Sequence, residues 1–203
     1  MNHNLAIGVD MQNDFCPGGT LAVPDGDLVI KPFNAVVNFV RQQNGTAVFT
    51  SDWHPIETNH FDAWPVHCLA NSLGAEFNPN LIVQTNDIVI SKGALKDEDA
   101  YSGFDGLDEN GDNIEKIIEN ILSKFQKISI YIGGLATDYC VKETVLDALE
   151  LQNKHSSKIA VFVLTDCIKA VNLNPSDGEK ALQNMKANGA RLITSTEVLN
   201  EHN

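Results

Sequence analysis

The sequence is short of basic residues and of long apolar runs, and each shortage excludes a class of protein. It has 14 Lys and Arg residues against 27 Asp and Glu residues, which gives a formal net charge of -13. Nucleic acid and anionic lipid would be repelled by such a surface, so we expect neither as a partner. No apolar run approaches the roughly 20 residues that cross a bilayer. We therefore expect no membrane association.

Cysteine is also sparse and never paired. The four cysteines, Cys16, Cys68, Cys140 and Cys167, are spread singly, without a Cys-x-x-Cys motif. In a chain of this size we interpret them as free thiols and not as a disulfide framework, which indicates a reducing compartment. The first ten residues have neither the basic segment nor the apolar core of a signal peptide. The sequence therefore predicts a cytoplasmic protein.

What the sequence does have is an alternation of short apolar runs with longer segments of helical periodicity. The predicted strands are residues 5–10, 46–52, 87–91, 128–133, 159–164 and 191–194. These runs are β-branched and nearly continuous, as expected for parallel strands covered on both faces. No repeat or linker interrupts them. We expect a single α/β domain over residues 1–203, a three-layer α/β/α, Rossmann-like arrangement with a mostly parallel central sheet.

The helical segments carry their own start signals. We predict helices over 27–43 and 113–125, one following Asp138 and one starting at Ser176. Pro32 is tolerated in the first of these only near its first turn. Asp112 is placed to cap the second. Ser176 and Glu179 have the spacing of a capping box.

Reactive side chains follow the ends of several predicted strands, where open parallel sheets bind their ligands. Asp10 ends the first strand, Lys92 follows the third, and a thiol follows each of the fourth and fifth, Cys140 and Cys167. A carboxylate, an amine and a thiol that meet at one edge make a nucleophile with its base and an electrostatic partner. The pattern alone does not exclude Cys167.

Cys140 is favoured by the segment around it. If Thr137 or Asp138 caps the next helix, Cys140 lies in the first turn, where free N–H groups stabilise a thiolate. The same N–H groups can receive the oxyanion of a tetrahedral intermediate. The alternative is a small buried thiol that only fills the core.

Possible metal ligands gather after the second predicted strand. Asp52 and His54 are two residues apart, hence on one side of an extended chain, and His60 and His67 follow within 16 positions of Asp52. Imidazole with carboxylate suits zinc, and also iron or manganese. The alternative is an accidental cluster on a surface loop. Two long irregular stretches, 11–26 and 55–84, are better explained by function than by disorder.

Six segments, taken in order, resemble the nicotinamidase branch of the isochorismatase-like hydrolases over nearly the full length. They are Val-Asp-Met-Gln-Asn-Asp-Phe-Cys-Pro-Gly-Gly at 9–19, Asp-Trp-His-Pro at 52–55, Trp-Pro-Val-His-Cys at 64–68, Ser-Lys-Gly at 91–93, Tyr-Ser-Gly-Phe at 101–104 and Gly-Leu-Ala-Thr-Asp-Tyr-Cys-Val at 134–141. Any one of them is weak evidence, but six in family order are specific.

The resemblance implies roles that the residue types leave open. It implies that Cys140 is the nucleophile, with Asp10 as the proton-transferring base and Lys92 completing the triad. It also implies an oxyanion hole formed by the backbone N–H groups of Ala136 and Cys140, with a cis peptide before Ala136.

The same resemblance implies a metal centre and an aromatic slot. It implies one divalent metal ion, zinc before iron or manganese, held by Asp52, His54 and His67, with His60 at a fourth position that varies among members. Phe15 and Trp64 look like the walls of a pyridine slot, and Tyr101 and Tyr139 like further contacts.

The implied activity is hydrolysis of nicotinamide to nicotinate and ammonia through a cysteine thioester, with pyrazinamide also accepted and a role in NAD salvage. The partner is then a small-molecule substrate, and a homo-oligomer is compatible with the sequence. Two alternatives remain open. One is a metal-free relative, an isochorismatase or an amidase of carbamoyl or ureido compounds. The other is a non-catalytic metal or thiol sensor on the same fold.

Overall fold

A six-stranded parallel sheet forms the centre of the computed structural model, which describes residues 2–98, 100–155 and 158–200; the rest of the expected 1–203 domain lies outside this range. The strand order is β3-β2-β1-β4-β5-β6, and every pairing is parallel. The strands are β1 (Asn2–Val9), β2 (Thr46–Asp52), β3 (Ile88–Lys92), β4 (Lys127–Leu135), β5 (Ile159–Lys169) and β6 (Arg191–Ile193). All six predicted strands are confirmed.

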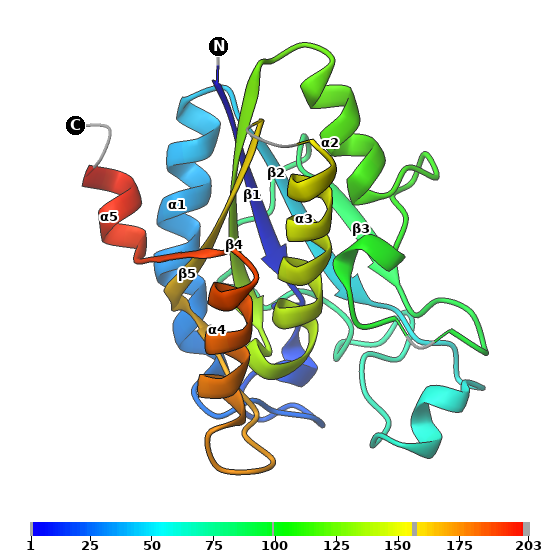
Figure 1. Ribbon diagram of the computed structural model, residues 1–203. Coiled ribbons are helices and arrows are strands. Elements are labelled where there is room, and N and C mark those ends of the chain that lie inside the picture. Colours follow the sequence, from blue (N-terminus) through cyan, green and yellow to red (C-terminus); the bar gives the residue numbers. More distant parts are fainter. Residues whose placement is uncertain (1, 99, 156–157, 201–203) are drawn as a thin grey trace.

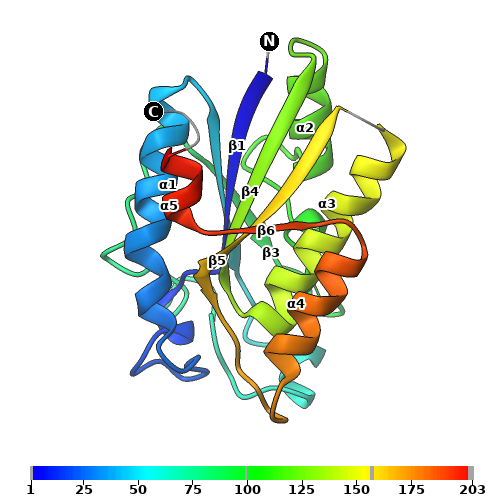
Figure 2. The same cartoon turned by 60° about the vertical axis from the view of Figure 1, so that its left-hand side comes forward.

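Helices cover both faces of this sheet (Figures 1 and 2). One face carries α1 (Ile30–Gln42) and α5 (Ser195–Asn200), and the other carries α2 (Ile114–Leu122), α3 (Lys142–Lys154) and α4 (Asp177–Ala187). A separate hydrophobic core fills each side of the sheet. The predicted three-layer α/β/α architecture is therefore confirmed. No helix in the described ranges is both long and apolar enough to cross a membrane.

The continuous apolar runs form strands because both of their faces are buried. In β1, Leu5 and Ile7 belong to the core under α2 and α3, while Ala6 between them belongs to the core under α1. All three side chains are fully buried. A one-residue slip of β1 would exchange its two faces without exposing either, so burial alone does not set its register. The register is set by pairing with the neighbouring strands, where Leu5 lies opposite Thr46 on β2 and Ile130 on β4.

Strand β5 runs further than its apolar stretch predicts. β5 continues through Thr165 and Asp166 to Lys169, because its ladder with β4 resumes after an irregularity and pairs Leu135 with Lys169. Cross-strand hydrogen bonds, which the hydrophobic pattern does not report, set the strand end here.

Two predicted helix caps are wrong. α2 is capped by Asn113, whose side chain accepts the N–H of Lys116, and not by Asp112, whose own N–H donates to Asp108 in the preceding turn. At α4, Ser176 takes a left-handed conformation (φ 72°) and its side chain makes no cap. The expected capping box is therefore absent there, and Asn172 accepts the N–H of Gly178 in its place.

The start of α1 agrees with the expectation that Pro32 lies near the first turn of its helix. A short 3-10 turn, Gly26–Val29, precedes α1, and Pro32 is the third residue of the helix proper. Its missing N–H is therefore one that would have no partner within the helix.

The two long irregular segments lie together beyond the carboxyl ends of the strands, at the lower end of the view in Figure 1. They contain only short 3-10 turns, at Asn13–Phe15 and Asn59–Asp62. They also contact each other, since the Asn13 N–H donates to Glu76 and the Asp14 N–H to Gly74. This edge of the sheet is where the candidate side chains meet.

Candidate active site

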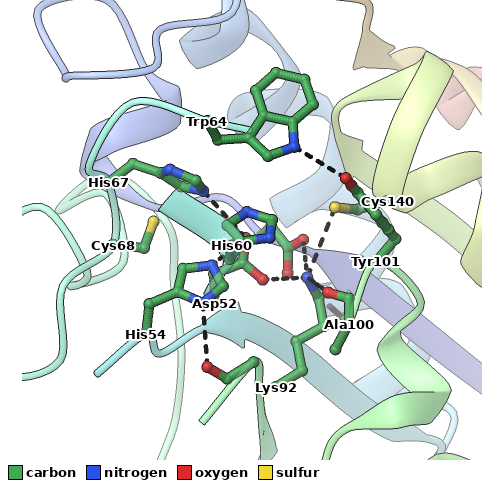
Figure 3. Close-up of polar contacts among 12 residues, drawn as sticks. Asp52, His54, His60, Trp64, His67, Cys68, Lys92, Ala100, Tyr101 and Cys140 are labelled. Atoms are coloured by element: carbon green, nitrogen blue, oxygen red, sulfur yellow. Dashed lines mark hydrogen bonds and ion pairs between the residues drawn. The ribbon is translucent and has the colours of Figure 1, made fainter. Parts of the chain in front are cut away.

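Asp10, Lys92 and Cys140 converge in the buried interior at this edge. Asp10 directly follows β1, Lys92 is the last residue of β3, and Cys140 lies in the turn between β4 and α3. Lys92 Nζ lies 2.9 Å from Asp10 Oδ2 and 3.6 Å from Cys140 Sγ, a contact drawn in Figure 3. Lys92 thus contacts both the carboxyl group and the sulfur, and the three side chains lie close together as the sequence predicts.

Lys92 is the electrostatic centre of the group. Its ammonium also donates to Asp52 Oδ1 and to the carbonyl oxygen of Ala100, and its side chain is fully buried. Burial opposes its charge, but Asp10 and Asp52 outweigh burial and hold the pKa of Lys92 well above its ordinary value. Lys92 is therefore charged. It is buried in the interior and does not lie at the surface.

The two carboxyl groups beside Lys92 differ in the direction of their pKa shifts. Burial raises the pKa of Asp10 even though Lys92 opposes the shift. Burial also raises the pKa of the Cys140 thiol well above its ordinary value, against the attraction of Lys92. For Asp52 burial acts upward too, but Lys92 and His54 together outweigh it, and the pKa of Asp52 is lowered. At rest the site therefore holds a neutral thiol beside an ionised Asp52 and a charged Lys92.

The turn that carries Cys140 differs from the expected helix start. Residues Thr137–Val141 form a wide turn ahead of α3, and the N–H groups of Tyr139 and Val141 both donate to the carbonyl of Ala136. Ala136 occupies the N-cap position, so neither Thr137 nor Asp138 caps the helix. The peptide bond between Leu135 and Ala136 is cis, as expected.

Asp138 has another contact in place of capping. Its carboxylate accepts the N–H groups of Val171 and Asn172, in the loop that follows β5. The turn of the thiol is thereby tied to the loop of Val171.

Cys167 is not part of this group. It lies on β5 in the core under α1, whereas Cys140 belongs to the core on the other face of the sheet. Its sulfur contacts Asp166 at 3.7 Å, and burial raises its pKa. Of the two thiols that the sequence leaves open, only Cys140 contacts Lys92.

Three imidazoles face one another next to Asp52. Ring nitrogens of His54, His60 and His67 all lie within 4.8 Å of one another, and all three side chains are buried. Asp52 Oδ2 lies 3.7 Å from His54 Nε2 and 3.9 Å from His67 Nε2. The four residues predicted as ligands therefore converge on one point, beside Lys92 in Figure 3.

The hydrogen bonds of two histidines select the tautomer that binds metals. Nδ1 of His54 donates to the carbonyl of Gly93 at 3.1 Å, and Nδ1 of His67 donates to that of Pro65 at 2.7 Å. Each Nε2 then presents a lone pair. Burial lowers the pKa of His67, which favours the same neutral form.

The arrangement of these lone pairs indicates whether the four residues can hold a cation. His54 Nε2 is buried without a hydrogen-bond partner among the described residues, and it faces the ionised Asp52. Acceptors that converge without a shared proton repel one another unless a positive charge lies between them. A nitrogen and oxygen donor set of this kind fits zinc, iron or manganese.

A cavity opens between the thiol and the imidazoles. It is lined by the expected aromatics, Phe15, Trp64, Tyr101 and Tyr139, together with Cys140, Asp52, His60, His67 and Ala136. Trp64 Nε1 donates to the Tyr101 hydroxyl at 2.9 Å, and the rings of Trp64 and Tyr139 meet edge to face with centroids 5.1 Å apart. Aromatic side chains thus form one wall of a slot of mostly apolar character.

Several residues of the site escaped the sequence analysis. Five of them line the cavity: Leu21, Val23, Ala100, Leu135 and Val171. Gln12 binds both backbone groups of Asp52, with Nε2 on its carbonyl and Oε1 on its N–H, each at 2.8 Å. The hydroxyl of Thr50 donates to Asp10 Oδ1 at 2.6 Å. For Gln12 the available signal was its place beside Asp10 in the first motif; Thr50 reads as an ordinary strand residue.

Comparison with known proteins places this geometry in a family. The sequence profile described as Isochorismatase domain matches residues 5–197. The chain belongs to the isochorismatase family. Among relatives, a nicotinamidase of Escherichia coli (strain K12) is 36% identical over 205 residues, covering 92% of each chain.

Solved structures of the family agree in fold. The pyrazinamidase of Pyrococcus horikoshii, crystallised in complex with zinc, has a TM-score of 0.81 at 36% identity and covers 95% of this chain and 99% of its own. The protein PnC1 from L. infantum, in complex with nicotinate, has a TM-score of 0.78 at 30% identity and covers 96% and 93% respectively. The isochorismatase-like fold expected from the motifs is confirmed.

Proposed function

We propose that this protein is a nicotinamidase, an amidohydrolase that converts nicotinamide and water to nicotinate and ammonia. The observation that carries the proposal is the contact of Lys92 with both Asp10 and Cys140, beside the imidazole cluster and inside an aromatic cavity. The Escherichia coli relative, named a nicotinamidase, and the L. infantum structure, which is in complex with nicotinate, support it. By the general role of that enzyme, the reaction belongs to NAD salvage.

Acylation begins with the proton of the thiol. Asp10 takes the proton from Cys140 Sγ, and the sulfur forms a bond to the carboxamide carbon while the carbonyl electron pair moves to oxygen. Lys92 favours this step, because its charge stabilises the thiolate that the buried site otherwise disfavours. The C–N bond then breaks, the nitrogen takes the proton held by Asp10, and ammonia leaves a thioester.

The negative oxygen of the intermediate is received by backbone N–H groups. We assign this role to Ala136 and Cys140, which both line the cavity. Removing a donor of this kind from a known enzyme typically costs about 3 kcal/mol in the transition state.

Deacylation uses the same acid and base. Asp10 takes a proton from water, the hydroxide oxygen bonds to the thioester carbon, and the C–S bond breaks to release nicotinate. Cys140 recovers its proton from Asp10, so the site returns to the neutral thiol favoured by its raised pKa.

Asp52, His54, His60 and His67 would hold the metal ion. Bound there, the ion would supply a Lewis acid that could bind the pyridine nitrogen and so orient the substrate. We propose zinc, with iron and manganese as alternatives. Asp52 has a second duty, because it also neutralises part of the charge of Lys92.

Phe15, Trp64, Tyr101 and Tyr139 are proposed to enclose the pyridine ring. Flat aromatic and apolar walls accept a six-membered ring by its shape. They do not distinguish the pyridine ring of nicotinamide from the ring of pyrazinamide, which has a second nitrogen, so we expect pyrazinamide to be hydrolysed as well. We also propose that residues 1–203 form one domain in the cytoplasm; the single sheet and the four free, buried cysteines support this.

The deciding experiment measures ammonia release from nicotinamide together with the metal content of the purified protein. We expect ammonia, nicotinate and close to one metal ion per chain. Metal without ammonia would favour a sensor, and ammonia from a carbamoyl compound without metal would favour a metal-free relative. Either result contradicts the proposed function.

A further inference from the structure

We propose that Thr50 is a positioning residue that fixes the rotation of the Asp10 carboxyl group, with Oδ1 held by the Thr50 hydroxyl and Oδ2 turned toward Lys92. The inference rests on the proposed function, because it concerns the group that takes the proton from Cys140 and returns it to the leaving group. Thr50 is not among the residues that line the cavity.

Thr50 lies on the strand that also carries the metal ligand. It is two residues before Asp52 on β2, so the two side chains point to the same side of the sheet. Thr50 is fully buried. Its position opposite Asp10 is fixed by the backbone, since the N–H of Asp10 donates to the carbonyl of Thr50 at 3.2 Å.

The hydroxyl of Thr50 makes two contacts with the same aspartate. It donates to Asp10 Oδ1 at 2.6 Å, and its oxygen accepts the N–H of Asp10 at 3.3 Å. Within the described ranges these are the hydrogen bonds of this hydroxyl. A hydroxyl has a single proton to donate, and here that proton points at Oδ1.

The two oxygens of Asp10 are therefore unequal. Oδ1 faces a neutral donor, whereas Oδ2 faces the ammonium of Lys92 at 2.9 Å, and that ammonium contacts Cys140 Sγ. Each oxygen is therefore held by a different donor. Together the two contacts fix the rotation of the carboxyl group.

The consequence for the reaction is a carboxyl group held in one orientation while it carries the proton. The Sγ–H bond of Cys140 breaks as an O–H bond forms on Asp10. That O–H bond then breaks as the nitrogen of the substrate gains its N–H bond and leaves with the electron pair of the C–N bond. Without the hydroxyl of Thr50, the carboxyl group is free to rotate out of this orientation.

The test replaces Thr50 with valine, which has nearly the same shape but lacks the hydroxyl. For Thr50→Val we expect kcat for nicotinamide to fall roughly tenfold to a hundredfold, the size of one lost buried hydrogen bond, while KM and metal content stay as in the unmodified protein. Thr50→Ser, which keeps the hydroxyl, should restore most of kcat. The matched control is Thr46→Val on the same strand, where the hydroxyl pairs with His3; it should leave kcat unchanged.

A second readout does not depend on nicotinamide. Iodoacetamide alkylates Cys140 only as the thiol loses its proton, so the alkylation rate, followed by peptide mass spectrometry, should fall in Thr50→Val and not in Thr46→Val. If the unmodified protein fails to hydrolyse nicotinamide but shows this difference, the nicotinamidase proposal falls and the role of Thr50 stands. Equal rates in the two variants, or a Ser variant as impaired as the Val variant, would overturn the role of Thr50.

Discussion

Lys92 is the residue on which the charge balance of the site depends. Its buried ammonium lies between two buried carboxylates, Asp10 and Asp52, and contacts the thiol as well. Buried charges are tolerated only when they are paired. Catalysis and folding therefore share this residue.

Replacing Lys92 with Met should destabilise the protein as well as inactivate it. The change leaves two carboxylates facing each other without a cation, which typically costs about 3–5 kcal/mol. Urea unfolding followed by circular dichroism measures the loss. Lys96→Met, at an exposed position, is the control and should change the free energy of unfolding by about 0.5 kcal/mol or less. Equal stability of the two variants would contradict the buried ion pairs.

Replacing Cys140 and replacing Cys167 should have different effects on activity. Cys140→Ala should reduce ammonia release at least roughly a thousandfold, since loss of a nucleophile removes the covalent route, and it should leave folding and metal content intact. Cys167→Ala, in the other core of the sheet, should keep its turnover. Retained turnover in the Cys140 variant would remove this residue from the mechanism.

The sequence largely identified the reactive residues, but it did not show which side chains they contact in the folded protein. Asp10, Lys92 and Cys140 stand out in the sequence because reactive side chains at strand ends are few. Nothing in the sequence says that Lys92 is buried, since an amine beside a strand is usually solvated. Thr50 gave no signal at all, because its function depends on a neighbour 40 positions away.

At the scale of elements, turns and helix ends were the weakest part of the sequence analysis. The strand cores and the helical stripes follow from burial, which repeats along the chain and can be read from it. Caps depend on single hydrogen bonds. At α2, Asp112 and Asn113 are both suitable cap residues by type, and only the path of the preceding turn decides between them.

The capping assignment at α2 can be tested by stability. Asn113→Ala should lower the free energy of unfolding by about 1 kcal/mol, because it leaves the N–H of Lys116 without its partner. Asp112→Ala should lower it by about 0.5 kcal/mol or less, because the hydrogen bond of Asp112 is made by its backbone. Urea titrations of the two variants decide the matter, and the reverse order would restore the assignment to Asp112.

The turn that carries Cys140 positions both the thiol and part of the cavity wall. This turn ends β4 and leads into α3, and Asp138 ties it to the loop of Val171. Val171 lines the cavity. The thiol and one wall of the substrate slot are thereby positioned by the same side chain.

At the scale of the whole molecule, the strand order brings the site together. Asp10 follows β1, Asp52 ends β2 and Lys92 ends β3, which are adjacent strands on one side of the sheet, and Cys140 follows β4 next to β1. The carboxyl ends of four neighbouring strands therefore bring these residues to one edge of the sheet. The loop between β2 and β3 adds His54, His60 and His67 above them.

Removing the metal should loosen this arrangement as a whole. The ligands lie on β2 and on the long loop after it, so an ion that binds only the folded chain adds about 2.7 kcal/mol when present at a hundred times its Kd. For a protein of this size that corresponds to a Tm lower by roughly 5–10 °C after chelation. Differential scanning calorimetry with and without added zinc measures the shift.

Two histidine variants serve as the comparison for this experiment. His54→Ala should lose the zinc-dependent shift in Tm, because it removes the buried imidazole whose Nε2 faces Asp52. His155→Ala should keep it, because that ring pairs with Glu119 away from the cluster. A shift that survives in His54→Ala would mean that zinc binds elsewhere.

The sequence by itself determined the layers, the strand cores and the inventory of reactive side chains, because burial and residue type repeat or stand out along the chain. Only the tertiary structure decided the strand order, the burial of Lys92, the helix caps and the partners of Gln12 and Thr50. Each of these depends on contacts between residues far apart in the sequence or on one hydrogen bond. Such contacts leave no periodic trace in the sequence.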